Sequence, residues 1–508
     1  MNNDDLNNKS VIELKVIAKE MQIKNFRTLK KLELIDAIQR ELLSKNEENS
    51  EMNIKEEQGD FYGAQIKKDG IILREKIAKH EVEKDCGSIN KDESDCNEEL
   101  FNETSEESRE TMEEIKNDNL EDKRERLKTL ISESETAKGI FELSDNANFG
   151  LLRMNNYISS NEDIYVSISQ VRRFNLKNGD EVEGKVRMSK EGEKYKALLQ
   201  VLKINGENPE RAVNRAPFEK LTPIYPTERL KLEVENSKDL STRIMDIVSP
   251  IGKGQRGIIV APPKAGKTSI LKKIAHSLAD NHPEVKVLVL LIDERPEEVT
   301  DMQRSISGDV IYSTFDEEPE HHTKVASMVL ERAKRMVEQG QDVVILLDSL
   351  TRLARAYNLT ITRTGRTLSG GLDTGALLMP KKFFGAARNV EEGGSLTILA
   401  TALVETGSRM DEMIFEEFKG TGNMEVHLDR QLQERRIFPA IDIYKSGTRR
   451  EDLLLTKTQL EVSYNIRKFM HNAGNAQGIT EKLLGILSKT QNNEEFFDIV
   501  SKNPDIVK

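Results

Sequence analysis

The sequence is short of several residue types, and each shortage excludes a class of protein. Its 508 residues include no tryptophan and only two cysteines, Cys86 and Cys96. Two thiols cannot build a disulfide framework or a four-ligand zinc site, so a reducing cytoplasm is expected. No run approaches the roughly 20 apolar residues of a membrane helix, and the polar first ten residues lack the apolar core of a signal peptide. We therefore expect a cytoplasmic protein with no membrane partner.

Basic residues are fewer than acidic ones, 76 against 88, which gives a net charge of −12. An evenly spread acidic charge would argue against a nucleic-acid partner. The charge is not even, because residues 45–136 hold 28 acidic and 15 basic side chains, a net of −13. The rest of the chain carries 60 acidic and 61 basic side chains. The composition therefore does not exclude RNA, but it predicts binding by stacking and local loops.

Four stretches of the chain differ in residue pattern. Residues 1–44 predict a small helical domain, because a capping box starts at Ser10 and apolar residues recur at helical spacing. Residues 45–136 predict a disordered acidic insert. Residues 137–222 hold short strand candidates between Asn-Gly and Glu-Gly turns, typical of a small β-barrel. Residues 223–508 alternate apolar strands with helices, which predicts an α/β domain with a mostly parallel sheet.

The expected elements of the two β-containing stretches follow from these patterns. In the barrel the strand candidates are 149–153, 164–168 and 195–201. In the α/β domain they are 257–261, 287–293, 343–348 and 396–403, with helices at 268–280 and 322–339.

The strongest chemical signal is the segment APPKAGKT at 261–268, between an apolar strand and a helical pattern. This is the context of a P-loop, whose backbone N–H groups and helix N-terminus bind phosphate. Lys267 is expected to neutralise the β- and γ-phosphates, and Thr268 to ligate Mg²⁺. The first position is Ala261 instead of glycine, which the loop tolerates if Ala261 stays extended. A chance match on a surface turn is the weaker alternative.

Two further strands end in acidic residues, as a nucleotide hydrolase requires. Asp348 ends the strand 343–348 and suits a Mg²⁺-bound water. Asp293, Glu294 and Arg295 end the strand 287–293. Hydrolysis needs a carboxylate that orients and polarises the attacking water, and Glu294 is the candidate. Its alternative role is an ion pair at the strand end with Arg295.

Basic residues on glycine-containing loops form a third set of candidates. Arg366 and Arg409 lie on loops that could follow a phosphate backbone. Taken alone, each loop is more simply an ordinary solvated one. Arg449 follows Ser-Gly-Thr and suits an arginine finger, which accelerates phosphoryl transfer by about 10³–10⁵ where present. An exposed salt-bridging arginine is its plain alternative.

Aromatic and basic residues interleave in the predicted barrel. Phe149 lies near Arg153, Tyr165 precedes two arginines, and Tyr195 has a lysine on each side. A base stacked on an aromatic ring contributes about 1–3 kcal/mol. Several of these rings could equally belong to the barrel core, so the pattern alone leaves nucleic-acid binding and a structural role evenly balanced.

Longer segments resemble the Rho family of bacterial transcription termination factors. They are APPKAGKT, LLIDERPEEV (290–299), LLDSLTRLARAYN (346–358), MPKKFFGAARNVEEGGSLTILATAL (379–403), EEFKGTGNMEVHL (416–428) and FPAIDIYKSGTRRE (438–451). The resemblance implies a cold-shock-like OB barrel ahead of a RecA-type ATPase. It implies a homohexamer that hydrolyses ATP with Mg²⁺, translocates on single-stranded, cytosine-rich nascent RNA, and works with RNA polymerase and auxiliary termination factors. The alternative is a rotary- or secretion-type ATPase of the same fold, without RNA dependence.

The resemblance also implies roles for individual residues. Glu294 is the catalytic base, Lys267 holds phosphate, and Arg449, with Arg436 nearby, reaches the nucleotide of a neighbouring subunit. Arg295 senses the γ-phosphate and Phe438 packs on the adenine. The implied nucleotide-binding residues are Gly252, Lys253, Gly254, Gln255, Arg256, Gly257, Lys264, Ala265, Gly266, Lys267, Thr268, Ser269, Arg295 and Phe438. The implied Mg²⁺ residues are Thr268 and Asp348. The implied RNA-binding residues are Phe149, Arg153, Asp163, Tyr165, Glu193, Tyr195, Arg366 and Arg409.

The sequence departs from the family pattern in three places. Leu151 replaces the second aromatic of the Phe149 strand, which removes one stacking surface. Arg366 and Arg409 stand where lysine is usual; an arginine offers a planar fork where lysine is a point charge. The insert at 45–136 has no counterpart in compact members. It could drive assembly, bind a basic partner, or serve only as a solvated linker.

Overall fold

The computed structural model describes residues 132, 134–144, 146, 148–189, 192–235, 237–473 and 476–503. The predicted helical domain at 1–44 lies outside the described residues, as does nearly all of the predicted insert at 45–136 with both cysteines. Within the described part, no helix is long and apolar enough to cross a membrane.

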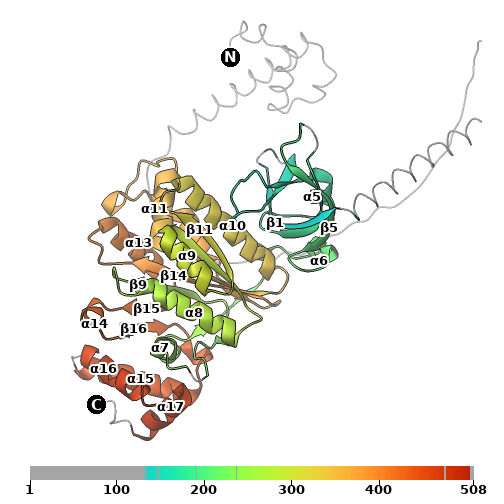
Figure 1. The fold of residues 1–508 in the computed structure, drawn as a ribbon. Helices are drawn as coiled ribbons and strands as arrows, with labels where there is room; N and C mark the ends of the chain where they lie inside the picture. Colours follow the sequence, from blue (N-terminus) through green and yellow to red (C-terminus); the bar gives the residue numbers. More distant parts are fainter. Residues whose placement is uncertain are drawn as a thin grey trace, which may run out of the picture. The chain divides into compact units, whose positions relative to one another are not determined.

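The first folded unit is a closed five-stranded barrel with strand order β1-β2-β3-β5-β4 (Figure 1). Its strands are β1 (Glu135–Leu143), β2 (Phe149–Arg153), β3 (Ile164–Ser167), β4 (Glu181–Arg187) and β5 (Lys196–Ile204). Helix α5 (Ile168–Phe174) follows β3 through a capping box between Ser167 and Gln170. Residues of alternating strand positions, including Phe141, Leu152 and Val182, fill the interior. A short helix, α6 (Pro209–Val213), and η1 (Phe218–Lys220) lead out of the barrel.

The α/β domain is built on a nine-stranded, mostly parallel sheet. The main strand order is β11-β10-β12-β14-β9-β15-β16, and only β16 in this path is antiparallel to its neighbour. The strands in that order are β11 (Asp309–Thr314), β10 (Lys286–Glu294), β12 (Asp342–Asp348), β14 (Ser395–Leu403), β9 (Arg256–Ala261), β15 (Met424–Leu428) and β16 (Ile441–Thr448). Strands β13 (Arg388–Val390) and β6 (Pro223–Ile224) extend the sheet beside β14, and β7 (Arg229–Leu230) pairs with β8 (Ile251–Gly252).

Helices cover both faces of this sheet, so its central strands are apolar on both sides. In β10, Val289 and Leu291 belong to one buried core while Leu290 and Ile292 belong to the other. The first core packs under α7 (Leu240–Val248), α8 (Lys267–Asn281), α9 (Pro296–Ser305), α15 (Lys457–Ala473), α16 (Ala476–Leu487) and α17 (Asn493–Lys502). The second packs under α10 (Pro319–Val337), α11 (Leu350–Thr360), α12 (Leu378–Gly385) and α13 (Arg409–Lys419). The short helix α14 (Arg430–Glu434) joins β15 to β16.

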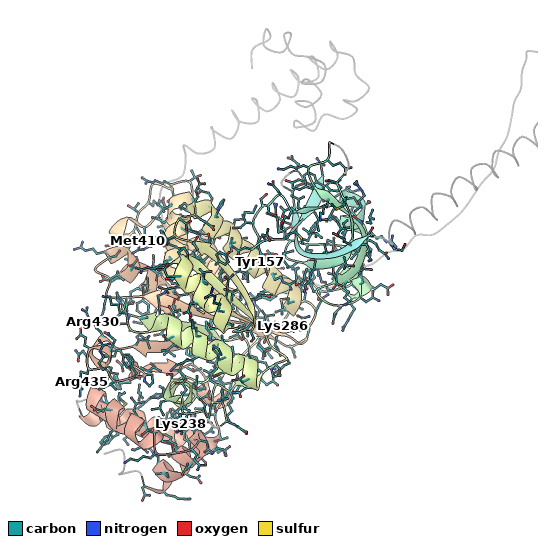
Figure 2. All side chains as sticks on the ribbon, viewed as in Figure 1. Tyr157, Lys238, Lys286, Met410, Arg430 and Arg435 are labelled. Atoms are coloured by element: carbon teal, nitrogen blue, oxygen red, sulfur yellow. The ribbon has the colours of Figure 1, made fainter. Side chains whose placement is uncertain are left out.

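The barrel contacts the α/β domain along α10, and Figure 2 shows Tyr157 at this junction. Arg215 is buried there and donates two hydrogen bonds to Asp180, at 2.5 and 2.6 Å. Its Nε also lies 2.9 Å from Glu338, the residue that ends α10. A buried pair of this kind is costly to break from one side, about 3–5 kcal/mol, because the remaining charge loses its partner. The junction is therefore a specific polar contact as well as an apolar one.

The structure confirms the predicted fold class for the part it describes. A small barrel precedes an α/β domain with a mostly parallel sheet, and the expected strands appear as β2, β3, β5, β9, β10, β12 and β14. Strands β1 and β4 and helix α5 were not predicted. The expected strand at 164–168 ends one residue early, because Ile168 begins α5 after the Ser167 cap.

Candidate nucleotide and nucleic-acid sites

The P-loop segment lies between β9 and α8, at the carboxyl end of the sheet. Ala261 is the last residue of β9 and pairs with Leu403. It therefore has the extended conformation under which the loop tolerates alanine in place of glycine. Lys264 and Gly266 both have positive φ, 67° and 94°, which turns the chain sharply into α8. Helix α8 begins at Lys267, so its first backbone N–H groups are available to an anion. Lys264 and Ser269 are exposed beside this loop, and Ala265 is buried.

Lys267 lies between two carboxylates at the ends of neighbouring strands. Its Nζ is 3.0 Å from Glu294 at the end of β10 and 2.7 Å from Asp348 at the end of β12. Burial alone would lower the pKa of Lys267, but these two carboxylates outweigh it and raise the pKa. The ammonium is therefore fully charged at neutral pH and available for phosphate.

Thr268, the next residue, faces a cluster of oxygen atoms. Its Oγ1 lies 3.4 Å from Asp348 and 3.4 Å from Glu298, which is in the first turn of α9. Asp348 is buried and also accepts a hydrogen bond from Thr401 on β14, at 2.7 Å. Among the described residues, no group of three or more His, Cys, Asp or Glu side chains forms a metal cluster by itself.

Glu294 owes its position to an irregularity in the sheet. The pairing of β10 with β11 shifts register between Ile292 and Glu294, and Asp293 has a φ of 56°. Beyond this bulge the Glu294 side chain is buried, where Arg352 of α11 approaches it at 3.2 Å. Burial would raise the pKa of Glu294, but Lys267 and Arg352 lower it below the usual value. The carboxylate is therefore ionised at neutral pH, as a base must be.

Burial, reinforced by the charge of Glu294, raises the pKa of Glu298. The pKa values of these two neighbouring carboxylates are therefore shifted in opposite directions.

Of the remaining predicted nucleotide residues, Arg295 directly follows Glu294, and the others lie elsewhere in the chain. The run Gly252–Gly257 is at the opposite end of β9 from the P-loop, and its side chains are engaged structurally: Lys253 pairs with Asp342 at 2.8 Å, and Gln255 donates to Asn423 at 2.6 Å. The structure does not bring this run to the P-loop within one chain. Arg295, Arg436, Phe438 and Arg449 are all exposed.

Arg449 follows β16 at the rim of a cavity of about 340 Å³, and its backbone N–H donates to Asn423 at 2.8 Å. Within the described part of the chain, the Arg449 side chain forms no hydrogen bond or ion pair with the P-loop.

Three of the predicted RNA-binding residues line one cavity on the barrel, with a volume of about 350 Å³. Tyr165, Glu193 and Tyr195 surround it together with Arg187, Lys194 and Ala197. The Arg187 guanidinium holds the Glu193 carboxylate in a two-point contact, at 2.6 and 2.9 Å. Beside the cavity, the rings of Phe149 and Tyr165 stack with centroids 5.5 Å apart. This arrangement offers flat apolar faces and a fixed acceptor, which suits a base that carries an amino group.

The other two predicted barrel residues form a buried pair. Arg153 donates to Asp163 and, at 2.5 Å, to Glu142, and both Arg153 and Asp163 are buried. Asp163 also accepts hydrogen bonds from the backbone N–H and the hydroxyl of Ser160, at 3.1 and 2.9 Å. In this structure the pair holds the end of β2 against the loop before β3.

The two basic loops of the α/β domain lie against each other. The loop with Arg366 is closed by Asp373, which accepts hydrogen bonds from both the N–H and the hydroxyl of Thr364. Its Gly370 packs so closely on the backbone of Arg409 and Met410 that a Cβ there would lie 2.5 Å from the Met410 nitrogen. Both arginines are exposed. The structure thus brings these two predicted residues to one region.

Four site residues were not identified from the sequence: Arg187, Glu298, Arg352 and Thr401. The signal for Glu298 and Arg352 was present, because each lies four residues beyond a predicted strand-end acid, on the helix that follows. Arg187 and Thr401 carry no such signal. Each is one strand residue among many of its type.

The chain matches known protein families in three places and resembles known ATPase structures. Residues 5–47 match the family model "Rho termination factor, N-terminal domain", residues 137–210 match "Rho termination factor, RNA-binding domain", and residues 241–448 match "ATP synthase alpha/beta family, nucleotide-binding domain". Among solved structures, a type III secretion system ATPase of pathogenic bacteria matches with a TM-score of 0.46 and 21% identity, covering 57% of this chain and 87% of that one.

Two curated relatives match along most of their length. Transcription termination factor Rho of Bacillus subtilis (strain 168) is 60% identical over 365 residues, 72% of this chain and 84% of the relative. Rho of Escherichia coli (strain K12) is 54% identical over 369 residues, 72% of this chain and 88% of the relative. The chain therefore belongs to the family of the transcription termination factor Rho.

Proposed function

We propose that this protein is an RNA-stimulated ATPase that binds nascent transcripts and terminates transcription. The observation that carries the proposal is the pairing of two sites in one chain. One is Lys267 at the start of α8, held between Glu294 and Asp348. The other is the barrel cavity, in which two tyrosines flank the fixed carboxylate of Glu193. The first suits a nucleoside triphosphate and the second a nucleobase.

Nucleotide binding is expected to rearrange Lys267. The phosphates would accept hydrogen bonds from the backbone of the P-loop and draw the ammonium away from Glu294. The base would then keep its interaction with Arg352, which holds it ionised and oriented. From there Glu294 accepts a proton from the attacking water as that water approaches the γ-phosphate.

Mg²⁺ fits the oxygen-rich side of this site. The Thr268 hydroxyl and the Asp348 carboxylate, with Glu298 near Thr268, are the hard donors that this cation prefers. Bound there, the ion would neutralise the charge that develops on the phosphates. We propose that Arg295, exposed at the start of α9, senses the γ-phosphate.

Single-stranded RNA is the proposed ligand of the barrel. Tyr165 and Tyr195 would stack on bases, and Glu193 would accept a hydrogen bond from the amino group of cytosine. The α/β domain is proposed to form a second RNA contact, separate from that of the barrel. There Arg366 and Arg409, on two loops that touch each other, would contact the RNA backbone.

A homohexamer would complete the nucleotide site. Arg449 and Arg436 are exposed, so we propose that they act on the nucleotide of a neighbouring subunit, where Phe438 and the run Gly252–Gly257 also contribute. The proposed functional units are residues 137–222 for the barrel and 223–508 for the ATPase. RNA polymerase and auxiliary termination factors are proposed partners, and the cytoplasm, where transcripts are made, is the proposed location.

The test is the rate of ATP turnover with and without cytosine-rich RNA, together with the mass of the assembled particle. Turnover that rises when the RNA is added, in a particle of six subunits, supports the proposal. If the rate of ATP turnover does not change when RNA is added, a secretion- or rotary-type ATPase becomes the better hypothesis.

A further inference from the structure

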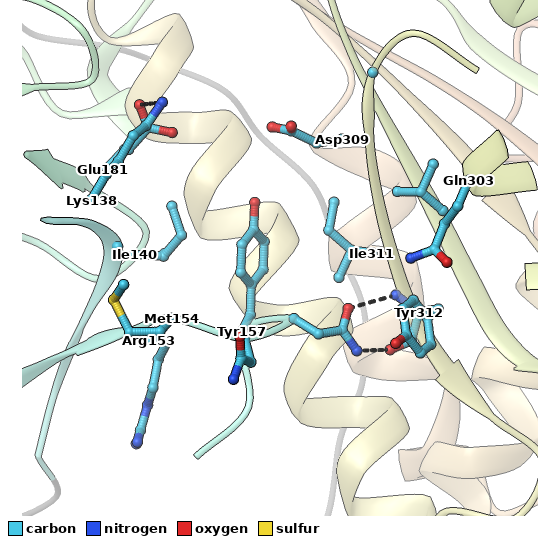
Figure 3. Close-up of a pocket in the computed structure, with 15 residues that line it drawn as sticks. Lys138, Ile140, Arg153, Met154, Tyr157, Glu181, Gln303, Asp309, Ile311 and Tyr312 are labelled. Carbon is cyan, nitrogen blue, oxygen red and sulfur yellow. Dashed lines mark hydrogen bonds and ion pairs between the residues drawn. The ribbon is translucent and has the colours of Figure 1, made fainter. Parts of the chain in front are cut away.

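A loop of the barrel binds the edge of the large sheet through one side chain (Figure 3). Asn156 donates from Nδ2 to the carbonyl oxygen of Tyr312, and its Oδ1 accepts from the backbone N–H of Tyr312 at 2.9 Å. Tyr312 belongs to β11, which ends the main strand order of the sheet. One amide therefore satisfies both backbone groups of a residue, as a neighbouring strand would. Asn156 and Tyr157 have φ values of 45° and 60°, so the loop is folded tightly for this contact.

The strand that Asn156 holds also fixes the backbone of the proposed catalytic base. On its other side β11 pairs with β10, and the register places Tyr312 opposite Leu291 and Thr314 opposite Glu294. The next residue, Phe315, donates its N–H to the carbonyl oxygen of Glu294 at 3.2 Å. Tyr312 is thus two residues from the partner of Glu294, about 7 Å along the strand. A shift of β11 would move Glu294 at the bulge, where its pairing is already irregular.

The same loop begins at the RNA-binding side of the barrel. Strand β2 runs from Phe149, which stacks on Tyr165, to Arg153, whose contacts with Asp163 and Glu142 fix the strand end. Asn156 follows three residues later. A change in β2 when a base stacks on Phe149 would therefore reach β11 with no other element between them.

We propose that Asn156 is a positioning residue that couples RNA bound on the barrel to the placement of Glu294 through β11. The inference rests on the proposed function, because it takes Glu294 as the catalytic base. It adds a named connection between the two sites within a single chain.

Other contacts hold the barrel in place independently of Asn156. Arg332 of α10 donates to Asn205 at 3.0 Å and to Glu181 at 2.5 Å. Arg215 binds Asp180, and the buried ring of Tyr157 belongs to the core of the α/β domain. Removing the Asn156 amide should therefore leave the chain folded and the barrel docked, so that a change in activity reports on coupling.

The experiment compares full-length Asn156→Ala and Asn156→Asp with wild type and with Asn155→Ala. Asn155 is the matched control, because it is the adjacent asparagine and its side chain donates within the barrel, to Glu162 at 3.1 Å. Measurements are basal ATP turnover, turnover at saturating oligo(C), the KM for ATP, the Kd for oligo(C) by filter binding, and the melting temperature. The aspartate keeps the acceptor but places an anionic oxygen against the Tyr312 carbonyl, so it tests the contact if alanine destabilises the chain.

Both Asn156 variants should lower RNA-stimulated kcat by about fivefold or more, the scale of a 1–3 kcal/mol coupling. Basal turnover, KM for ATP, Kd for oligo(C) and the melting temperature should stay near wild type, as should every value for Asn155→Ala. Unchanged stimulation in both variants would overturn the inference, and so would a loss explained entirely by weaker RNA binding or shared by Asn155→Ala. If wild type itself shows no RNA stimulation, it is the proposed function that fails.

Discussion

Replacing Glu294 with glutamine tests the proposed base most directly. The substitution keeps the shape of the side chain and removes its charge. Lys267 loses one of its two carboxylates but keeps Asp348 at 2.7 Å, so the P-loop lysine stays anchored. Arg352 can still donate to the amide oxygen. Nucleotide binding should therefore persist, or tighten, because the ammonium is more easily drawn to phosphate.

A general base contributes about 10²–10⁴-fold to the rate, so turnover should fall by that factor. This corresponds to an increase of roughly 3–5.5 kcal/mol in the activation barrier. We would measure steady-state ATP hydrolysis at saturating oligo(C) and, separately, binding of a fluorescent ATP analogue. Glu297→Gln is the matched control, since Glu297 is exposed in the first turn of α9, three residues along the chain. It should behave as wild type.

The reasoning fails if Glu294→Gln keeps more than about a tenth of wild-type turnover, because that loss is smaller than general-base catalysis allows. Glu298, the next carboxylate near Thr268, would then become the candidate. A variant that no longer binds the analogue would show instead that Glu294 organises the site.

Three further predictions concern other parts of the molecule. Mixing Arg449→Ala subunits with wild type should suppress turnover more than proportionally, whereas a proportional loss would contradict a finger that acts between subunits. Tyr195→Ala should weaken oligo(C) binding roughly 5- to 150-fold, the equivalent of 1–3 kcal/mol per stacked base, while the exposed Tyr444→Ala should not; equal affinities would refute the stacking role. Burial lowers the pKa of His322 below its usual value of 6.5, so the unfolded chain binds that proton more tightly. The stability due to neutral His322 is therefore full above about pH 6.5 and is lost as the pH falls. The melting temperature should accordingly decrease from pH 8 to pH 5, and it should decrease less steeply with pH in His322→Gln. Identical pH dependence of the two melting temperatures would refute this.

The sequence predicted those parts of the fold whose pattern is local. Strand β10 is a continuous apolar run that ends in acids, and the P-loop has a fixed spacing, so both were placed within a residue or two. Strand β1 was not predicted because Lys138 and Gly139 interrupt its apolar pattern, although the closed barrel requires this strand. Helix α5 was not predicted because Ile168 continues the apolar pattern of β3, and only the N-cap at Ser167 marks where the strand ends and the helix begins.

The site was predictable where residue type and position in a motif decide the role. Lys267, Thr268 and Asp348 meet because parallel strands bring their carboxyl ends to one edge of the sheet. The contact between Arg187 and Glu193 was not predictable, since it depends on how the chain returns from β4 to β5. The junction at Asn156 depends on how two units dock, and a sequence pattern carries no information about that.

The contact between Asn156 and Tyr312 also bears on aggregation. An edge strand with free backbone groups is a template for pairing with another chain. In this molecule the Asn156 side chain of the barrel occupies the two backbone groups of Tyr312 on β11, and the barrel residues Ile140 and Tyr157 join the buried core of the α/β domain. The barrel therefore also shields the β11 edge of the ATPase domain from pairing with another chain. A fragment that begins at residue 223 would expose both the edge and the apolar surface, and we expect it to form aggregates larger than the proposed hexamer where the full chain does not.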